Sequence, residues 1–130
     1  MSSATVETIM RKDYPELTPQ MPIRTAVARL VASDFSALPV VEDDGAIVGI
    51  LSQKDCFRPA LHASYYQEWT GCVADHMSAA TVTIERTEDA FFAAEMFLTH
   101  PFRILPVMDG TRAIGILVRS DVLAHLARNG

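Results

Sequence analysis

The sequence predicts a mixed α/β (α+β) protein in which one helix–strand–strand–helix unit occurs twice. The heptapeptide GILSQKD at residues 49–55 returns as GILVRSD at residues 115–121, 66 residues later. The tripeptide LPV at residues 38–40 returns at residues 105–107, at an offset of 67. Similarity at a nearly constant spacing indicates an internal repeat, which must be identified before any local motif is interpreted.

Each repeat opens with a predicted amphipathic helix. Apolar residues follow the i, i+3, i+4, i+7, i+8 spacing of one helix face in both repeats. They occupy positions 23, 26, 27, 30 and 31, and then positions 90, 93, 94, 97 and 98. The same helix is therefore expected at the same place in both repeats.

A hairpin and a second helix follow in each repeat. Short apolar runs on both sides of Gly and Asp residues are typical of two antiparallel strands joined by a turn. The predicted strands are residues 37–41 and 46–51, then 103–108 and 113–118. The predicted second helices are residues 52–62 and 119–128.

The repeat sets the expected domain boundaries at residues 1–67 and 68–130. Met10 corresponds to Met77 at the offset of 67, which places the start of each repeat. One such unit leaves apolar surface uncovered, so two units are expected to pack together. Tyr65, Tyr66 and Trp69 are expected to lie under the helices of the second unit, since large aromatic side chains usually serve packing.

Composition excludes several classes of protein. Of the 130 residues, 49% are hydrophobic and 21% charged, and no apolar run reaches the roughly 18 residues of a membrane span. The first residues lack the apolar stretch of a secretory signal, which favours the cytoplasm and reduced thiols at Cys56 and Cys72. A net charge of −5 without a cluster of basic residues argues against nucleic acid as a partner.

The chain contains an ordered set of features: Met10, the apolar segment ending at Thr18, the first helix, the sequence FSALPVVEDDGAIVGILSQKD and a second copy from Met77. This set of features resembles a tandem CBS-domain pair, or Bateman module. The resemblance implies two β-α-β-β-α repeats packed about a pseudo-twofold axis. It also implies a regulatory module rather than an enzyme. Such a module senses adenine nucleotides or S-adenosylmethionine between its repeats, forms homodimers and acts on a partner protein that the sequence does not identify.

The same resemblance assigns ligand-binding roles to individual residues. In the family pattern an aspartate accepts hydrogen bonds from ribose hydroxyls, a role suited to a carboxylate facing a diol. The residues so assigned are Thr18, Ser36, Ala37, Ser52, Asp55, Arg103, Ser120 and Asp121. Ser36 and Arg103 hold the positions expected to face phosphate. Val118 replaces Ser52 in the second repeat and donates no hydrogen bond. AMP, ADP, ATP and S-adenosylmethionine are the expected ligands, and no cofactor is required.

Other interpretations of these residues remain open. Ser52 and Asp55 also match a capping box, in which each side chain bonds the other's backbone at a helix N-terminus. Cys72 and His76 stand at i and i+4, but with Cys56 and His62 they match no common zinc spacing, so no metal site is predicted. No catalytic motif occurs. The alternative function is a structural dimerisation module without a small-molecule ligand.

Overall fold

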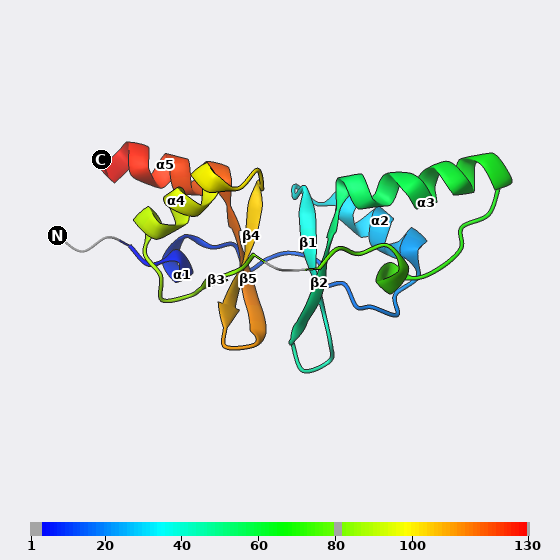
Figure 1. Cartoon of the computed structure of the whole chain (residues 1–130), viewed down its shortest axis with the longest axis horizontal. Coiled ribbons are helices and arrows are strands. Elements are labelled where there is room, and N and C mark those ends of the chain that lie inside the picture. Colours follow the sequence, from blue (N-terminus) through cyan, green and yellow to red (C-terminus); the bar gives the residue numbers. More distant parts are fainter. Residues whose placement is uncertain (1–3, 80–81, 130) are drawn as a thin grey trace. The chain divides into compact units, whose positions relative to one another are not determined.

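The computed structural model describes residues 4–79 and 82–129 and consists of two compact units. Unit 1 comprises Met1–Asp13 and Val82–Gly130, and unit 2 comprises Tyr14–Thr81. Within each unit, helices pack beside a β-hairpin (Figure 1). The predicted mixed α+β class is confirmed.

Unit 2 contains one antiparallel hairpin and its helices. In chain order its elements are α2 (Ile23–Ala32), β1 (Ala37–Val41), β2 (Ile47–Ser52), α3 (Gln53–Tyr66) and the 3-10 helix η1 (Val73–Asp75). β1 pairs with β2 so that Ala37 lies opposite Ser52. Leu17 adds a parallel bridge to Val40, at the other end of β1 from Ala37. The hairpin therefore brings the start of β1 to the start of α3.

Unit 1 repeats this plan with one more short strand. Its elements are α1 (Val6–Ile9), β3 (Ile84–Glu85), α4 (Ala90–Thr99), β4 (Ile104–Asp109), β5 (Arg112–Val118) and α5 (Arg119–Asn129). β3 runs parallel to β4, and β4 runs antiparallel to β5 with Ile104 opposite Val118. Asp89 caps α4, because its carboxylate accepts a hydrogen bond of 2.9 Å from the Phe92 amide. The start of β4 thus lies beside the start of α5.

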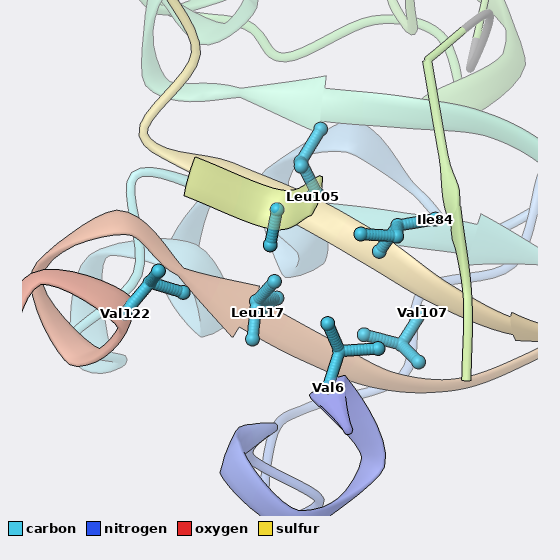
Figure 2. Packing of buried hydrophobic residues seen from close by; sticks show 7 residues of the cluster. Val6, Ile84, Leu105, Val107, Leu117 and Val122 are labelled. Atoms are coloured by element: carbon cyan, nitrogen blue, oxygen red, sulfur yellow. The ribbon is translucent and has the colours of Figure 1, made fainter. Parts of the chain in front are cut away.

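The hydrophobic core of unit 1 draws on elements far apart in the sequence. Its members are Val6, Ile84, Ala93, Leu105, Val107, Leu117 and Val122, each no more than 2% exposed. Figure 2 shows Val6 of α1 beside Val107 and Leu117 of the sheet. Burying a side chain of this kind contributes about 1.5–3 kcal/mol. The N-terminal segment is therefore an integral part of this core.

The compact units do not contain the same segments as the sequence repeats. The first repeat begins with the segment around Val6 and Arg11, yet this segment packs in unit 1, where Arg11 pairs with Ile116. The start of the second repeat packs in unit 2, where Ser78 pairs with Ile50. Each repeat thus contributes its first segment to the sheet formed by the other. The pattern of the repeat did not predict this exchange.

The prediction for two of the connecting aromatics is wrong. Tyr65 is 81% exposed and Tyr66 is 63% exposed, so neither lies under helices, while Trp69 is half-buried. Helix α3 continues to Tyr66, beyond its predicted end. Its buried stripe consists of Cys56, Pro59 and Ala63, whereas Tyr65 belongs to a second stripe with Phe57 and Leu61 that faces solvent. Spacing of i, i+4, i+8 places this second stripe on a different helix face.

Candidate functional site

Two aspartates occupy corresponding positions, one in each unit. Asp55 is the third residue of α3, and Asp121 is the third residue of α5. Both side chains are half-buried. A carboxylate in the first turn of a helix is stabilised by the positive end of the helix dipole. Each unit therefore carries a carboxylate acceptor where its hairpin meets its second helix.

Asp55 forms a capping box with Ser52, one of the two interpretations that the sequence allows for these residues. Its backbone N–H donates to Ser52 Oγ at 3.2 Å, and its Oδ2 accepts from the Ser52 backbone N–H at 3.0 Å. The capping interpretation is confirmed. The capping bond leaves Asp55 able to accept further hydrogen bonds, because the two oxygens of a carboxylate offer about four acceptor sites.

Ser78 also reaches Asp55, and sequence reasoning missed it. Its hydroxyl lies 3.1 Å from Asp55 Oδ1 and 3.3 Å from Oδ2. Backbone bonds to Ile50, of 2.8 and 2.9 Å, hold Ser78 against β2. A Cβ on Gly49 would come within 2.6 Å of Met77 Sδ, so glycine is needed for this approach.

Asp121 is held by a cation instead of a hydroxyl. Arg11 Nε donates to Asp121 Oδ2 at 2.8 Å, and its Nη2 donates to Oδ1 at 3.0 Å. Both carboxylate oxygens are engaged, in the bidentate geometry that gives Arg–carboxylate pairs their geometric specificity. Backbone bonds of 2.8 and 2.9 Å join Arg11 to Ile116. A Cβ on Gly115 would collide with Met10 Sδ, as one on Gly49 would with Met77 Sδ.

Extending the repeat by one residue beyond the two methionines would have identified Arg11 and Ser78, the side chains that contact the aspartates. Met10 and Met77 correspond at the offset of 67, and so do Arg11 and Ser78 that follow them. What the repeat could not indicate is that these residues reach an aspartate of the other repeat, because that requires the exchange of first segments.

The structure gathers most of the predicted site residues into two groups, one within each unit. Ser36 and Ala37 lie beside the start of α3, since the Gln53 amide donates to the Ser36 carbonyl at 2.9 Å and Ala37 pairs with Ser52. In unit 1 the Arg119 amide donates to the Arg103 carbonyl at 2.9 Å. This bond places Arg103 at the start of α5, whose second and third residues are Ser120 and Asp121. Arg103 and Ser120 are exposed, Ser36 is half-buried and Ala37 is buried.

Thr18 is not part of either group. Its neighbour Leu17 pairs with Val40, and the Val41 amide donates to the Leu17 carbonyl at 2.9 Å. Thr18 therefore lies at the far end of β1, about 13 Å along the strand from Ala37 at 3.3 Å per residue. It is half-buried, and its carbonyl accepts from the Met21 amide in a turn.

Both cysteines, Cys56 and Cys72, are free thiols. Within residues 4–79 and 82–129, no three His, Cys, Asp or Glu side chains are grouped to hold a metal ion. Burial, with a smaller contribution from the charge of Asp55, raises the pKa of Cys56 to about 11. This thiol therefore stays protonated at neutral pH, whereas the nucleophilic form is the thiolate. No helix in the described part of the chain is both long and apolar enough to cross a bilayer.

Comparison with known proteins gives a consistent family match. The family model for the CBS domain matches residues 6–61 and 73–128. Homoserine O-acetyltransferase of Methanocorpusculum labreanum is 26% identical over 124 residues, 95% of this chain and 24% of that protein. Inosine-5'-monophosphate dehydrogenase of Thermoplasma acidophilum is 25% identical over 120 residues, 92% of this chain and 23% of that protein. The chain thus spans about a quarter of the length of these two curated relatives.

Solved structures match over nearly the whole chain. CBSX2 in complex with AMP has a TM-score of 0.81 and 27% identity, covering 96% of this chain and 97% of its own. The CBS-pair protein CBSX2 from Arabidopsis thaliana has a TM-score of 0.83 and 26% identity, covering 98% and 97%. The CBS domain pair of MJ0100 in complex with 5'-methylthioadenosine and S-adenosyl-L-methionine has a TM-score of 0.78, covering 99% and 100%. At 20% identity, this last match shows a shared fold alone.

Proposed function

Because this chain belongs to the CBS domain family, we propose that it is a regulatory module that binds an adenine nucleotide or a related adenosyl ligand and does not itself catalyse a reaction. The observation that carries the proposal is the pair of corresponding carboxylates, Asp55 and Asp121, each placed at a helix N-terminus beside the start of a hairpin. Support comes from CBSX2, which matches 96% of this chain and binds AMP.

The chemistry of the two groups suits a nucleoside. Each aspartate would accept hydrogen bonds from the two ribose hydroxyls, since a carboxylate can accept from both members of a diol. Ser52 would support the same end of the ligand in unit 2, and backbone at Ser36 and Ala37 would face the base. In unit 1, Arg103 and Ser120 would contact the ligand, and the exposed Arg103 would donate hydrogen bonds to its phosphate. AMP, ADP, ATP and S-adenosylmethionine are the candidate ligands.

Regulation would follow from a shift in population. A ligand that contacts several segments of the chain favours the conformation in which all contacts are made, by no more than its difference in affinity between conformations. That conformation would be recognised by a regulated protein in the cytoplasm. The sequence division at residues 1–67 and 68–130 would then mark two copies that work as one module.

The direct test measures ligand binding through stability. Saturation at 100 times the dissociation constant should raise the unfolding free energy by about 2.7 kcal/mol. We expect AMP, ADP, ATP or S-adenosylmethionine to raise the melting temperature of the parent chain. The double substitution Asp55→Ala with Asp121→Ala should remove this rise. Asp43→Ala, which removes an exposed carboxylate outside both groups, serves as control. No rise with any of the four compounds would contradict the proposal.

A structural dimerisation module is the alternative, and one observation favours it. Phe57, Leu61 and Tyr65 form an exposed apolar stripe along α3, with exposures of 65%, 66% and 81%. Apolar patches on soluble proteins often mark interaction surfaces. We expect a homodimer by light scattering and a shift towards monomer in Leu61→Glu. A dimer that binds none of the four ligands would favour this alternative over sensing.

A further inference from the structure

The two aspartate groups differ in charge at corresponding positions. At three positions unit 1 carries arginine where unit 2 carries a neutral residue. The pairs are Arg11 and Ser78, Arg103 and Ser36, and Arg119 and Gln53. One position shows the reverse, since Lys54 in unit 2 corresponds to Ser120 in unit 1. The group around Asp121 is therefore the more cationic of the two.

Bonds within unit 1 keep these arginines close to Asp121. Arg11 is bound to the carboxylate by two hydrogen bonds, of 2.8 and 3.0 Å. Arg119 lies two residues before Asp121 in α5, and its amide bonds the Arg103 carbonyl. Arg11 is the one that engages Asp121 itself, so its effect on a ligand at this carboxylate should be the largest.

Arg11 changes what a ligand must do to reach Asp121. A ribose diol needs the carboxylate oxygens that the guanidinium already occupies. Neutral adenosine would replace two hydrogen bonds in which both partners are charged by two in which only the carboxylate is charged, and it would offer the displaced guanidinium no counter-charge. A phosphorylated ligand supplies an anion to which the guanidinium can transfer. The side chains of Arg11 and Asp121 are 42% and 27% exposed, and ion pairs with solvent access are weak enough to exchange.

Unit 2 imposes no such condition. Ser78 contacts Asp55 through a hydroxyl, which is both donor and acceptor and can rotate to accept from an incoming group. A neutral nucleoside can therefore join the network around Asp55 without leaving a charge unpaired.

We propose that Arg11 is a specificity-determining residue that makes the Asp121 group selective for phosphorylated adenine nucleotides over neutral adenosine. The inference rests on the proposed function and adds the class of ligand that each aspartate accepts. Arg11 acts as an internal competitor for the carboxylate and becomes a ligand for phosphate when displaced.

The experiment isolates the Asp121 group and compares two probes. Asp55→Asn replaces the carboxylate of unit 2 and keeps a side-chain oxygen that can accept from the Ser52 amide. In this background, calorimetry should show AMP binding at least tenfold tighter than adenosine. Adding Arg11→Ser, which installs the residue of the corresponding position, should bring this ratio below about three by weakening AMP and strengthening adenosine. Arg11→Lys keeps the charge and should retain a preference for AMP.

Controls separate local from general effects. Arg128→Ser removes the same charge from the exposed last turn of α5 in the same unit and should leave the ratio unchanged. The reciprocal change, Ser78→Arg in an Asp121→Asn background, should create a preference for AMP at Asp55. Thermal melts establish that each variant is folded.

The outcomes distinguish the inference from the function on which it rests. An AMP-to-adenosine ratio that Arg11→Ser leaves unchanged, while AMP still binds, overturns the role of Arg11 alone. A ratio that Arg128→Ser changes as much as Arg11→Ser also overturns it, because the effect would then be one of net charge. Absence of binding by either probe to the parent chain and to every variant overturns the proposed function, and the inference with it.

Discussion

Unit 1 and unit 2 share the backbone bonds that hold their first segments but differ in the side chain that contacts the aspartate. Arg11 pairs with Ile116 as Ser78 pairs with Ile50, through two backbone hydrogen bonds in each case. The side chains that extend from these matched positions are a guanidinium and a hydroxyl. Since backbone bonds fix the segment in both units, the fold does not require either side chain. These positions are thus free to set the chemistry of each aspartate.

The close approach of the first segment to the sheet should be the contact most sensitive to substitution. A Cβ on Gly115 would collide with Met10 Sδ and lie 3.1 Å from the Arg11 carbonyl. One on Gly49 would lie 2.6 Å from Met77 Sδ and 3.0 Å from the Ser78 carbonyl. We expect Gly115→Ala and Gly49→Ala each to lower the unfolding free energy by about 1–3 kcal/mol, as overpacking does. Urea denaturation measures this loss.

A second substitution tests the cause of that loss. Met10→Ala removes the sulfur that the new Cβ would meet, so the double variant with Gly115→Ala should lose less stability than the sum of the two single variants. Strict additivity would show that the methionine is not the obstacle. The same cycle with Met77→Ala and Gly49→Ala makes the comparison between units.

Capping should matter more in unit 2 than in unit 1. Ser52→Ala removes the hydroxyl that accepts from the Asp55 amide at 3.2 Å, and loss of such a cap costs about 1 kcal/mol. Val118→Ala, at the corresponding position, removes no hydrogen-bonding group and should cost only the packing of a half-buried side chain. Helix content and melting temperature by circular dichroism would check both. A Ser52→Ala variant as stable as the parent would argue against the box.

The smallest effect on stability is expected from the ion pair of unit 1. Arg11→Ser should lower the unfolding free energy by less than about 1 kcal/mol, because the pair has access to solvent. The difference from the parent should shrink further as salt rises, since screening weakens exposed charges. Ser78→Ala removes an uncharged hydroxyl from unit 2 and leaves the charges of the chain unchanged, so its effect should depend less on salt. A loss in Arg11→Ser that persists in 1 M salt would contradict the electrostatic explanation.

Much of the fold could be predicted from periodicity. The first helix of each repeat and both hairpins lie within one or two residues of their predicted positions, as for the strand predicted at 37–41 and found at Ala37–Val41. Helix α3 was predicted to end near residue 62 but continues to Tyr66, where Gln67 takes a left-handed conformation with φ of 60°. The last turn of this helix could not be predicted, because the sequence alone does not show whether aromatic residues such as Tyr65 and Tyr66 are exposed on a helix or buried beyond its end.

The site was predicted in part. The repeated heptapeptide identified Asp55 and Asp121, and the structure places Ser36, Ala37 and Ser52 beside the first and Arg103 and Ser120 beside the second. Thr18 was grouped with them by resemblance, but it lies at the other end of β1. Arg11 and Ser78 were missed because they contact aspartates 110 and 23 residues away in the sequence.

The sequence by itself determined the repeat, the order of helices and strands, and the two aspartates, because each of these depends on local spacing within one repeat. Only the tertiary structure decided which segment completes each sheet. Val6 and Arg11 belong to the first repeat in the sequence. The burial of Val6 and the backbone bonds of Arg11 nevertheless place both residues in unit 1, which is built mainly from the second repeat. Local patterns specify which surfaces must be buried, whereas the partner that buries them depends on the path of the whole chain.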